Sequence, residues 1–283
     1  MNKKNFYIPL IFFTSQILGL VAGKNLLPTT TTTPGAESPI TGLYFLFMIG
    51  FVTALMLLLY KFKQTKIIKG WYSLAVFLTV YIFFNTFVDT LPALIPAAIV
   101  FGVRTKTDNL ALKNVLDIFS YAGAGALFGS LIGFVPAIIF LIVLAVYDFI
   151  SVNITGHMVD LALEGLDTDT FMGIVFTHEP GDEEKLKEKP ASDESVEVVD
   201  KTENKQEIGL LGGGDVIAPM VLSVSLLKSF PLYVSITTAL GSTLGIIYIM
   251  TAEREQKFLP AIPILATSTF VGLGVGLLLT VLM

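Results

Sequence analysis

The chain contains no cysteine, only two histidines and few charges for its length. Of its 283 residues, 14% are charged and 53% are hydrophobic. The absence of cysteine excludes disulfides, thiol nucleophiles and thiolate metal sites. His157 and His178 are too few for a zinc site, and we expect neither a metal nor an organic cofactor. No glycine-rich phosphate loop follows a strand, and no basic aromatic patch suggests nucleic-acid binding. This composition indicates a helical membrane protein that crosses the bilayer many times.

Apolar runs of membrane-spanning length recur along the sequence. A spanning helix needs about 20 apolar residues. The runs cover residues 6–23, 40–60, 71–88, 91–103, 114–132, 133–152, 208–227, 232–250 and 259–283. We therefore expect an all-α membrane protein with about nine transmembrane helices. Residues 1–152 hold the first six helices, residues 153–207 form a polar segment, and residues 208–283 hold the last three.

The polar segment divides into three parts. Apolar and small residues in 153–170 have helical spacing, which favours an amphipathic extension at the membrane surface. Residues 171–176 are apolar and partly β-branched, as in a short strand. Residues 179–207 are rich in Glu, Asp, Lys and Ser, which predicts a disordered loop.

Basic residues are distributed unevenly between the two sides of the membrane. With nine spans, the far side carries only Lys24 and Lys228. The N-terminal side carries Lys3, Lys4, Lys61, Lys63, Lys66, Lys69, Arg104, Lys106, Lys113, Arg254 and Lys257. The excess of Lys and Arg on cytoplasmic loops places the N-terminus in the cytoplasm and the C-terminus outside.

Two aspartates interrupt apolar runs on consecutive spans. Asp148 lies late in the sixth span, and Asp215 lies early in the seventh, directly after three glycines. A charged group at the centre of a spanning helix costs at least about 2.5–3.5 kcal/mol, so such groups usually have a function. The two spans run antiparallel, which puts both carboxyl groups in the cytoplasmic half of the membrane. The alternative for Asp215 is a helix cap just outside the bilayer. Asp117 lies in the first turn of its run, where the helix dipole and water explain it.

Two facing carboxyl groups in an apolar site cannot both be ionised easily, so they share a proton. One group then activates water as a base while the other, as an acid, polarises a peptide carbonyl. This chemistry predicts an aspartic protease.

Three motifs occur in a fixed order on the sixth, seventh and ninth spans. They are Tyr147-Asp148, Gly212-Gly213-Gly214-Asp215 and Pro260-Ala261-Ile262. This arrangement resembles the presenilin and signal peptide peptidase family of intramembrane aspartyl proteases, whose third motif has leucine in place of isoleucine. The residues around Tyr147-Asp148 look especially like those of archaeal members.

The resemblance implies roles for the motif residues. Asp148 and Asp215 become the catalytic pair. Gly212 and Gly214 let the seventh helix begin irregularly and allow close approach. Tyr147 either acts at the site or is an interfacial aromatic.

The third motif and the possible strand are the remaining site candidates. Pro260, Ala261 and Ile262 would shape the floor of the site, although Pro260 is also explained as a helix start. A helical substrate must unwind before cleavage, and an edge strand can pair with the unwound backbone. The candidate substrate-pairing residues are Phe171, Met172, Gly173, Ile174, Val175 and Phe176. The alternative is that these residues simply pack on the membrane surface. If the segment pairs with substrate, residues 181–205 would be a dispensable tether.

The sequence thus predicts an integral membrane endopeptidase, in an archaeal cell membrane, that cleaves transmembrane proteins or signal peptides within the lipid bilayer. Its oligomeric state stays open. The rival is a proton or ion transporter that uses the two carboxylates. That function requires further polar residues along a pathway, and the spans contain few.

The orientation can be tested with single cysteines, because the natural chain has none. We expect an impermeant thiol reagent to label Thr32→Cys in intact cells. Asn2→Cys, Thr65→Cys and Ser192→Cys should react only after permeabilisation. Any other labelling pattern contradicts the predicted topology and the equal depth of the two aspartates.

Overall fold

The computed structural model describes residues 7–27, 38–155, 165, 170–178, 207–251 and 260–283. In this part of the chain nine α-helices follow the predicted spans. Six of the described helices are long and apolar enough to cross a membrane. The helices are α1 (Tyr7–Leu26), α2 (Pro39–Lys61), α3 (Thr65–Asn85), α4 (Thr90–Lys106), α5 (Leu110–Leu131), α6 (Phe134–Ile150), α8 (Gly213–Ser225), α9 (Leu232–Thr251) and α10 (Ala261–Leu282). The chain is therefore a helical membrane protein, as predicted, with one small sheet added.

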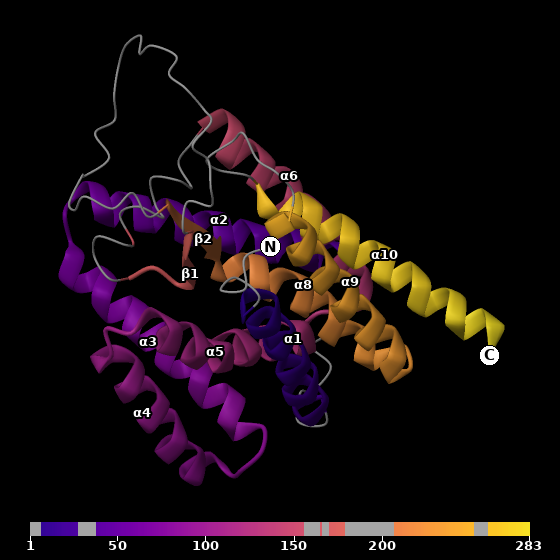
Figure 1. Cartoon of the computed structure of the whole chain (residues 1–283), viewed down its shortest axis with the longest axis horizontal. Coiled ribbons are helices and arrows are strands. Elements are labelled where there is room, and N and C mark those ends of the chain that lie inside the picture. The colour runs from indigo at the N-terminus through magenta and orange to yellow at the C-terminus, as the bar shows by residue number, and fades with distance from the viewer. Residues whose placement is uncertain (1–6, 28–37, 156–164, 166–169, 179–206, 252–259) are drawn as a thin grey trace.

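Helix α8 lies in the middle of the bundle (Figure 1). It packs against α1 and α5, and more lightly against α6, α9 and α10. Helices α3 and α4 pack on each other and on α5, while α2 packs mainly on α6. Helices α9 and α10 pack extensively on each other. The elements around α8 thus come from both halves of the sequence.

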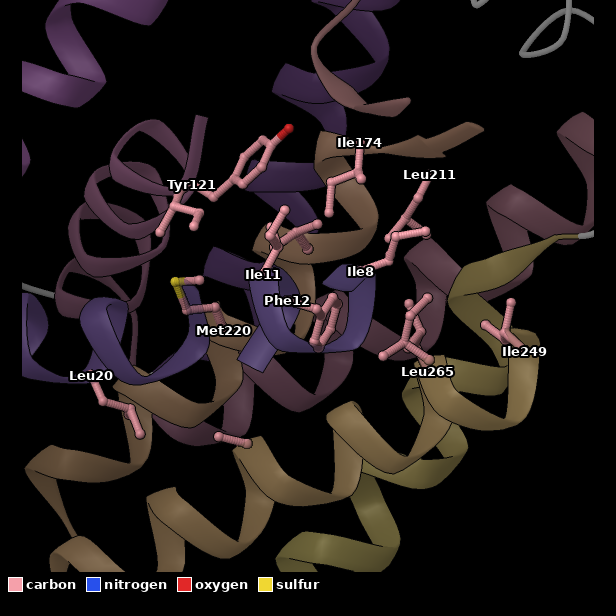
Figure 2. Close-up of a cluster of buried hydrophobic side chains, with 14 of the residues drawn as sticks. Ile8, Ile11, Phe12, Leu20, Tyr121, Ile174, Leu211, Met220, Ile249 and Leu265 are labelled. Atoms are coloured by element: carbon pink, nitrogen blue, oxygen red, sulfur yellow. The ribbon is translucent and has the colours of Figure 1, made fainter. Parts of the chain in front are cut away.

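An antiparallel hairpin of two strands precedes α8. Strand β1 (Gly173–His178) pairs with β2 (Glu207–Gly212), with Gly173 opposite Gly212. The strand predicted over residues 171–176 therefore exists, shifted by two residues. Ile174 and Leu211, which lie opposite each other, are buried in a hydrophobic cluster with side chains of α1, α5 and α8 (Figure 2).

The seventh span differs from the prediction. A helix was expected over residues 208–227, but residues 208–212 belong to β2 and α8 begins at Gly213. Consecutive glycines disfavour a helix by up to about 1 kcal/mol each, and pairing with β1 satisfies the backbone groups of the strand. Helix α8 has 13 residues, or about 20 Å, which is shorter than the hydrocarbon core of a bilayer.

Glycines on the neighbouring helices receive two side chains of α8. A Cβ at Gly19 of α1 or Gly125 of α5 would collide with Met220. A Cβ at Gly23 or Gly129, one turn further along each helix, would collide with Val224. Small residues spaced by four allow helices to approach closely inside a membrane. Because Met220 and Val224 fill the space beside these four glycines, the depth of α8 between α1 and α5 is fixed.

Two predictions concern residues that the structure does not describe. The amphipathic extension over residues 153–170 is described only at 153–155, in a π-helical turn (Ser151–Thr155), and at 165 and 170. The acidic loop lies outside the described residues, apart from Glu207 in β2.

Candidate active site

Asp148 lies in the last turn of α6 and is only 5% exposed. Its side-chain Oδ2 accepts a hydrogen bond of 3.2 Å from the backbone N–H of Ile262. Ile262 is the second residue of α10, and the first N–H groups of a helix have no acceptor within it. The positive end of the helix dipole also favours a negative charge here. The start of α10 is thus an acceptor site for the carboxylate of Asp148.

The Pro260-Ala261-Ile262 motif brings α10 to that position. Pro260 occupies the N-cap of α10, where its missing N–H leaves no donor unsatisfied. Pro260 and Ile262 are buried, and Ile262 packs with Leu144 and Ala218 in the cluster between α6, α8 and α10. The motif that starts α10 therefore also places the N–H group that binds Asp148.

Asp215 is the third residue of α8 and is half-buried. Its Oδ2 accepts a hydrogen bond of 3.0 Å from the N–H of Gly212, the N-cap residue. The capping role considered as an alternative is therefore present, but Asp215 also lies close enough to Asp148 for electrostatic interaction. The two carboxyl groups come from different helices, α6 and α8, and Asp215 directly follows the hairpin.

The three glycines before Asp215 have different surroundings. A Cβ at Gly212 would lie 3.3 Å from the Asp215 carboxylate, and one at Gly213 would lie 3.1 Å from the Tyr121 ring. A Cβ at Gly214 would meet nothing within 4 Å. A close approach is thus present at Gly212, where it was expected, and also at Gly213, where it was not. At Gly214, where it was expected too, no described atom comes close.

Tyr147 precedes Asp148 and is half-buried. It forms a side-chain hydrogen bond with Thr53 of α2 and packs on the cluster between α6, α8 and α10. Its neighbours therefore include α2 as well as its own helix.

The candidate substrate-pairing residues begin next to the start of α8. Phe171 and Met172 precede β1, and Met172 accepts a hydrogen bond of 2.8 Å from the N–H of Gly213. Ile174 is fully buried in the core, where it belongs to a cluster with side chains of α1, α5 and α8. The hairpin is part of the bundle and leads directly into Asp215.

The hydrogen bond from Gly213 to Met172 sets the pattern of the ladder. In antiparallel pairs, bonded and non-bonded positions alternate. Ile174 therefore directs its N–H and C=O toward β2, while Gly173 and Val175 direct theirs away. On the other strand, Leu210 and Gly212 face away from β1, as the bond from Gly212 to Asp215 requires. Each strand thus has one outward edge.

A buried glutamine that the sequence did not single out binds the residue after Asp215. Gln16 of α1 has no exposed surface, and its Nε2 donates a hydrogen bond of 2.9 Å to the carbonyl of Val216. An amide in the middle of an apolar membrane helix was the available indication, since such groups usually face a partner inside the bundle.

The surroundings of Asp117 also differ from the prediction. Helix α5 begins at Leu110 with Asn109 as its cap, so Asp117 lies about two turns inside the helix and is 2% exposed. It forms a buried ion pair with Arg104 of α4 rather than facing water. Among the described residues, no group of three or more His, Cys, Asp or Glu side chains could hold a metal ion.

Comparisons with known proteins agree with the motifs. The family model described as signal-peptide peptidase, presenilin aspartyl protease matches residues 10–282. A solved structure of a presenilin family intramembrane aspartate protease, in space group C222, is 22% identical, with a TM-score of 0.65 over 96% of this chain and 97% of that one. Another, in space group P2, is 21% identical, with a TM-score of 0.65 over 98% of each chain. No curated protein sequence matches.

The two solved structures show a shared fold, and the family model covers nearly the whole chain. Nothing in these comparisons supports the transporter alternative. The chain belongs to the signal-peptide peptidase and presenilin family and is an intramembrane aspartyl endopeptidase.

Proposed function

We propose that Asp148 and Asp215 are the catalytic pair of this endopeptidase. The observation that carries the proposal is their placement. Two carboxyl groups from α6 and α8 lie within electrostatic reach of each other, and each accepts a backbone N–H. Two such groups share one proton in an apolar site.

The shared proton provides both steps of peptide hydrolysis. The ionised carboxyl group takes a proton from water, and the water oxygen attacks the peptide carbonyl carbon. The protonated carboxyl group gives its proton to the carbonyl oxygen. As the C–N bond breaks, the carboxyl group that took the proton from water gives it to the leaving nitrogen. The other carboxylate takes a proton from a hydroxyl group of the tetrahedral diol, so the pair again holds one shared proton.

The substrates we infer are single membrane-spanning segments, including signal peptides, in agreement with the family description. We also infer a cytoplasmic N-terminus and an external C-terminus from the distribution of Lys and Arg. Cleavage then takes place in the cytoplasmic half of an archaeal cell membrane.

We infer that the substrate, once unwound, adds a third strand to the hairpin. Its backbone groups need partners at membrane depth. The outward edge of β1, at Gly173 and Val175, pairs with no other strand in the described part of the chain. On β2, the outward N–H of Gly212 is already bonded to Asp215. The edge of β1 is therefore the better template for β-augmentation.

The first prediction tests the pair itself. Asp148→Asn and Asp215→Asn should each reduce cleavage by about 10²–10⁴-fold, because asparagine acts neither as acid nor as base. Asp89→Asn, at the exposed N-cap of α4, is the matched control and should retain normal turnover. The measurement is cleavage of a single-span test substrate in detergent, with thermal unfolding to verify the fold. Normal turnover in either active-site variant would refute the assignment.

The second prediction tests the donor from α10. Ile262→Pro removes both the side chain and the N–H that binds Asp148, whereas Ile262→Ala removes only the side chain. A hydrogen bond to a charged group contributes about 1.5–3 kcal/mol, so turnover of the proline variant should be at least about tenfold below that of the alanine variant. Equal turnover in the two variants would mean that this hydrogen bond does not serve catalysis.

The third prediction concerns the outward edge of β1. Val175→Pro removes an outward N–H, so the strand pairing within the hairpin survives while substrate pairing is lost. We expect kcat/KM to fall about tenfold with folding intact. Leu210→Pro is the matched variant on the outward edge of β2 and should have a small effect.

Two outcomes would contradict this prediction. If Leu210→Pro loses activity and Val175→Pro does not, the substrate strand lies on β2. If both cleave normally, no strand addition takes place. Deletion of residues 181–205 should leave cleavage largely intact.

A further inference from the structure

A buried ion pair lies away from the two aspartates, between α4 and α5. Arg104 is 7% exposed and Asp117 is 2% exposed. The guanidinium donates to both carboxylate oxygens, from Nε to Oδ1 and from Nη2 to Oδ2, the latter at 3.1 Å. A buried ion pair is weak evidence of stabilisation, because desolvation offsets much of the attraction. The pair therefore calls for another explanation.

The same guanidinium holds a tyrosine of α3. Arg104 Nη2 also donates to the hydroxyl of Tyr72, and its guanidinium lies 5.3 Å from the centre of the Tyr72 ring. Arginine can only donate hydrogen bonds, so its N–H points at the oxygen of the Tyr72 hydroxyl group. The O–H proton of Tyr72 therefore points to a different group. The ion pair thus fixes both the position of Tyr72 and the direction of its proton.

That proton is directed at the entry to β1. The Tyr72 hydroxyl donates a hydrogen bond of 3.0 Å to the carbonyl of Phe171. Phe171 lies two residues before the strand, and its carbonyl faces away from β2 by the alternation of the ladder. Just before it, Thr170 and Tyr60 of α2 are joined through their hydroxyl groups at 3.1 Å. Helices α2 and α3 together hold the chain where it enters the hairpin.

From this entry the connection to Asp215 is short. Met172, the residue after Phe171, accepts the N–H of Gly213 at 2.8 Å. Gly213 is the first residue of α8 and packs on Tyr121, which lies one turn after Asp117 on α5. Tyr72 of α3 and Tyr121 of α5 therefore contact the two paired ends of the hairpin, at Phe171 before β1 and at Gly213 after β2.

We propose that Asp117, Arg104 and Tyr72 are positioning residues for proteolysis. Asp117 orients Arg104, Arg104 orients Tyr72, and Tyr72 holds the Phe171 carbonyl so that the outward edge of β1 keeps its place relative to Asp215. This role rests on the proposed strand addition and catalytic pair. It explains why charge is buried in α4 and α5, which supply no catalytic group.

The test removes one hydroxyl group from the full-length protein. Tyr72→Phe keeps the ring and its contact with the guanidinium but loses the hydrogen bond to Phe171. Tyr81→Phe is the matched control on the same helix, because its hydroxyl bonds only weakly, at 3.5 Å, to the carbonyl of Thr90. Cleavage of a single-span substrate is measured per active site, after titration with a transition-state inhibitor that binds the aspartates.

We expect Tyr72→Phe to lower kcat/KM about fivefold, mainly through a higher KM, with no change in the affinity for the inhibitor. Tyr81→Phe should keep the kcat/KM of the natural protein. Arg104→Lys should show the same rise in KM, since lysine can pair with Asp117 but lacks the fork that also reaches Tyr72. In combination with Val175→Pro, Tyr72→Phe should add little, because both act through the same strand.

Unchanged kcat/KM in Tyr72→Phe would overturn the proposal. A loss that matches a fall in the titrated active fraction would also overturn it, because the role would then be structural only. Asp148→Asn and Asp215→Asn, measured in parallel, separate these outcomes from a failure of the catalytic assignment.

Discussion

A carboxyl group inside an apolar helical bundle requires hydrogen-bond donors, and here the donors are the ends of secondary-structure elements. Asp148 binds the N–H of Ile262 at the start of α10, and Asp215 binds that of Gly212 at the end of β2. Both N–H groups are available because the first residues of a helix lack an internal acceptor and because Gly212 faces away from β1. An unbroken membrane helix has no free backbone donor in its interior. The interruptions by glycine and proline are thus a condition for burying the two aspartates.

A broken span must still be held at a defined depth. Helix α8 is too short to cross the bilayer, so its position depends on packing rather than on its own length. Met220 and Val224 pack against glycines of both α1 and α5, and Gln16 of α1 binds the carbonyl of Val216. These contacts place Asp215 at one height relative to α6. The first helix, which carries none of the three motifs, is therefore part of the support of the site.

The hairpin connects the two halves of the molecule. One end of β1 is held by hydroxyl groups of α2 and α3, and the other strand continues into α8. Ile174 and Leu211 bury the middle of the hairpin in the core. Since a two-stranded hairpin alone is only marginally stable, its order depends on these surroundings. The N-terminal helices can thus influence the geometry near Asp215 although they lie outside the catalytic motifs.

The sequence by itself determined the class of protein, the approximate spans, the pair of aspartates and the three motifs, because hydrophobic length and isolated membrane charges are local properties of the chain. The short apolar stretch over residues 171–176 also indicated a strand. Only the tertiary structure decided that residues 208–212 are extended, since that conformation depends on pairing with a strand about 35 residues earlier. It also decided that Arg104, expected in a cytoplasmic loop, and Asp117, expected in water, are buried together. The partner of a buried polar group is set by which helices pack side by side, and hydrophobic patterns alone do not encode that choice.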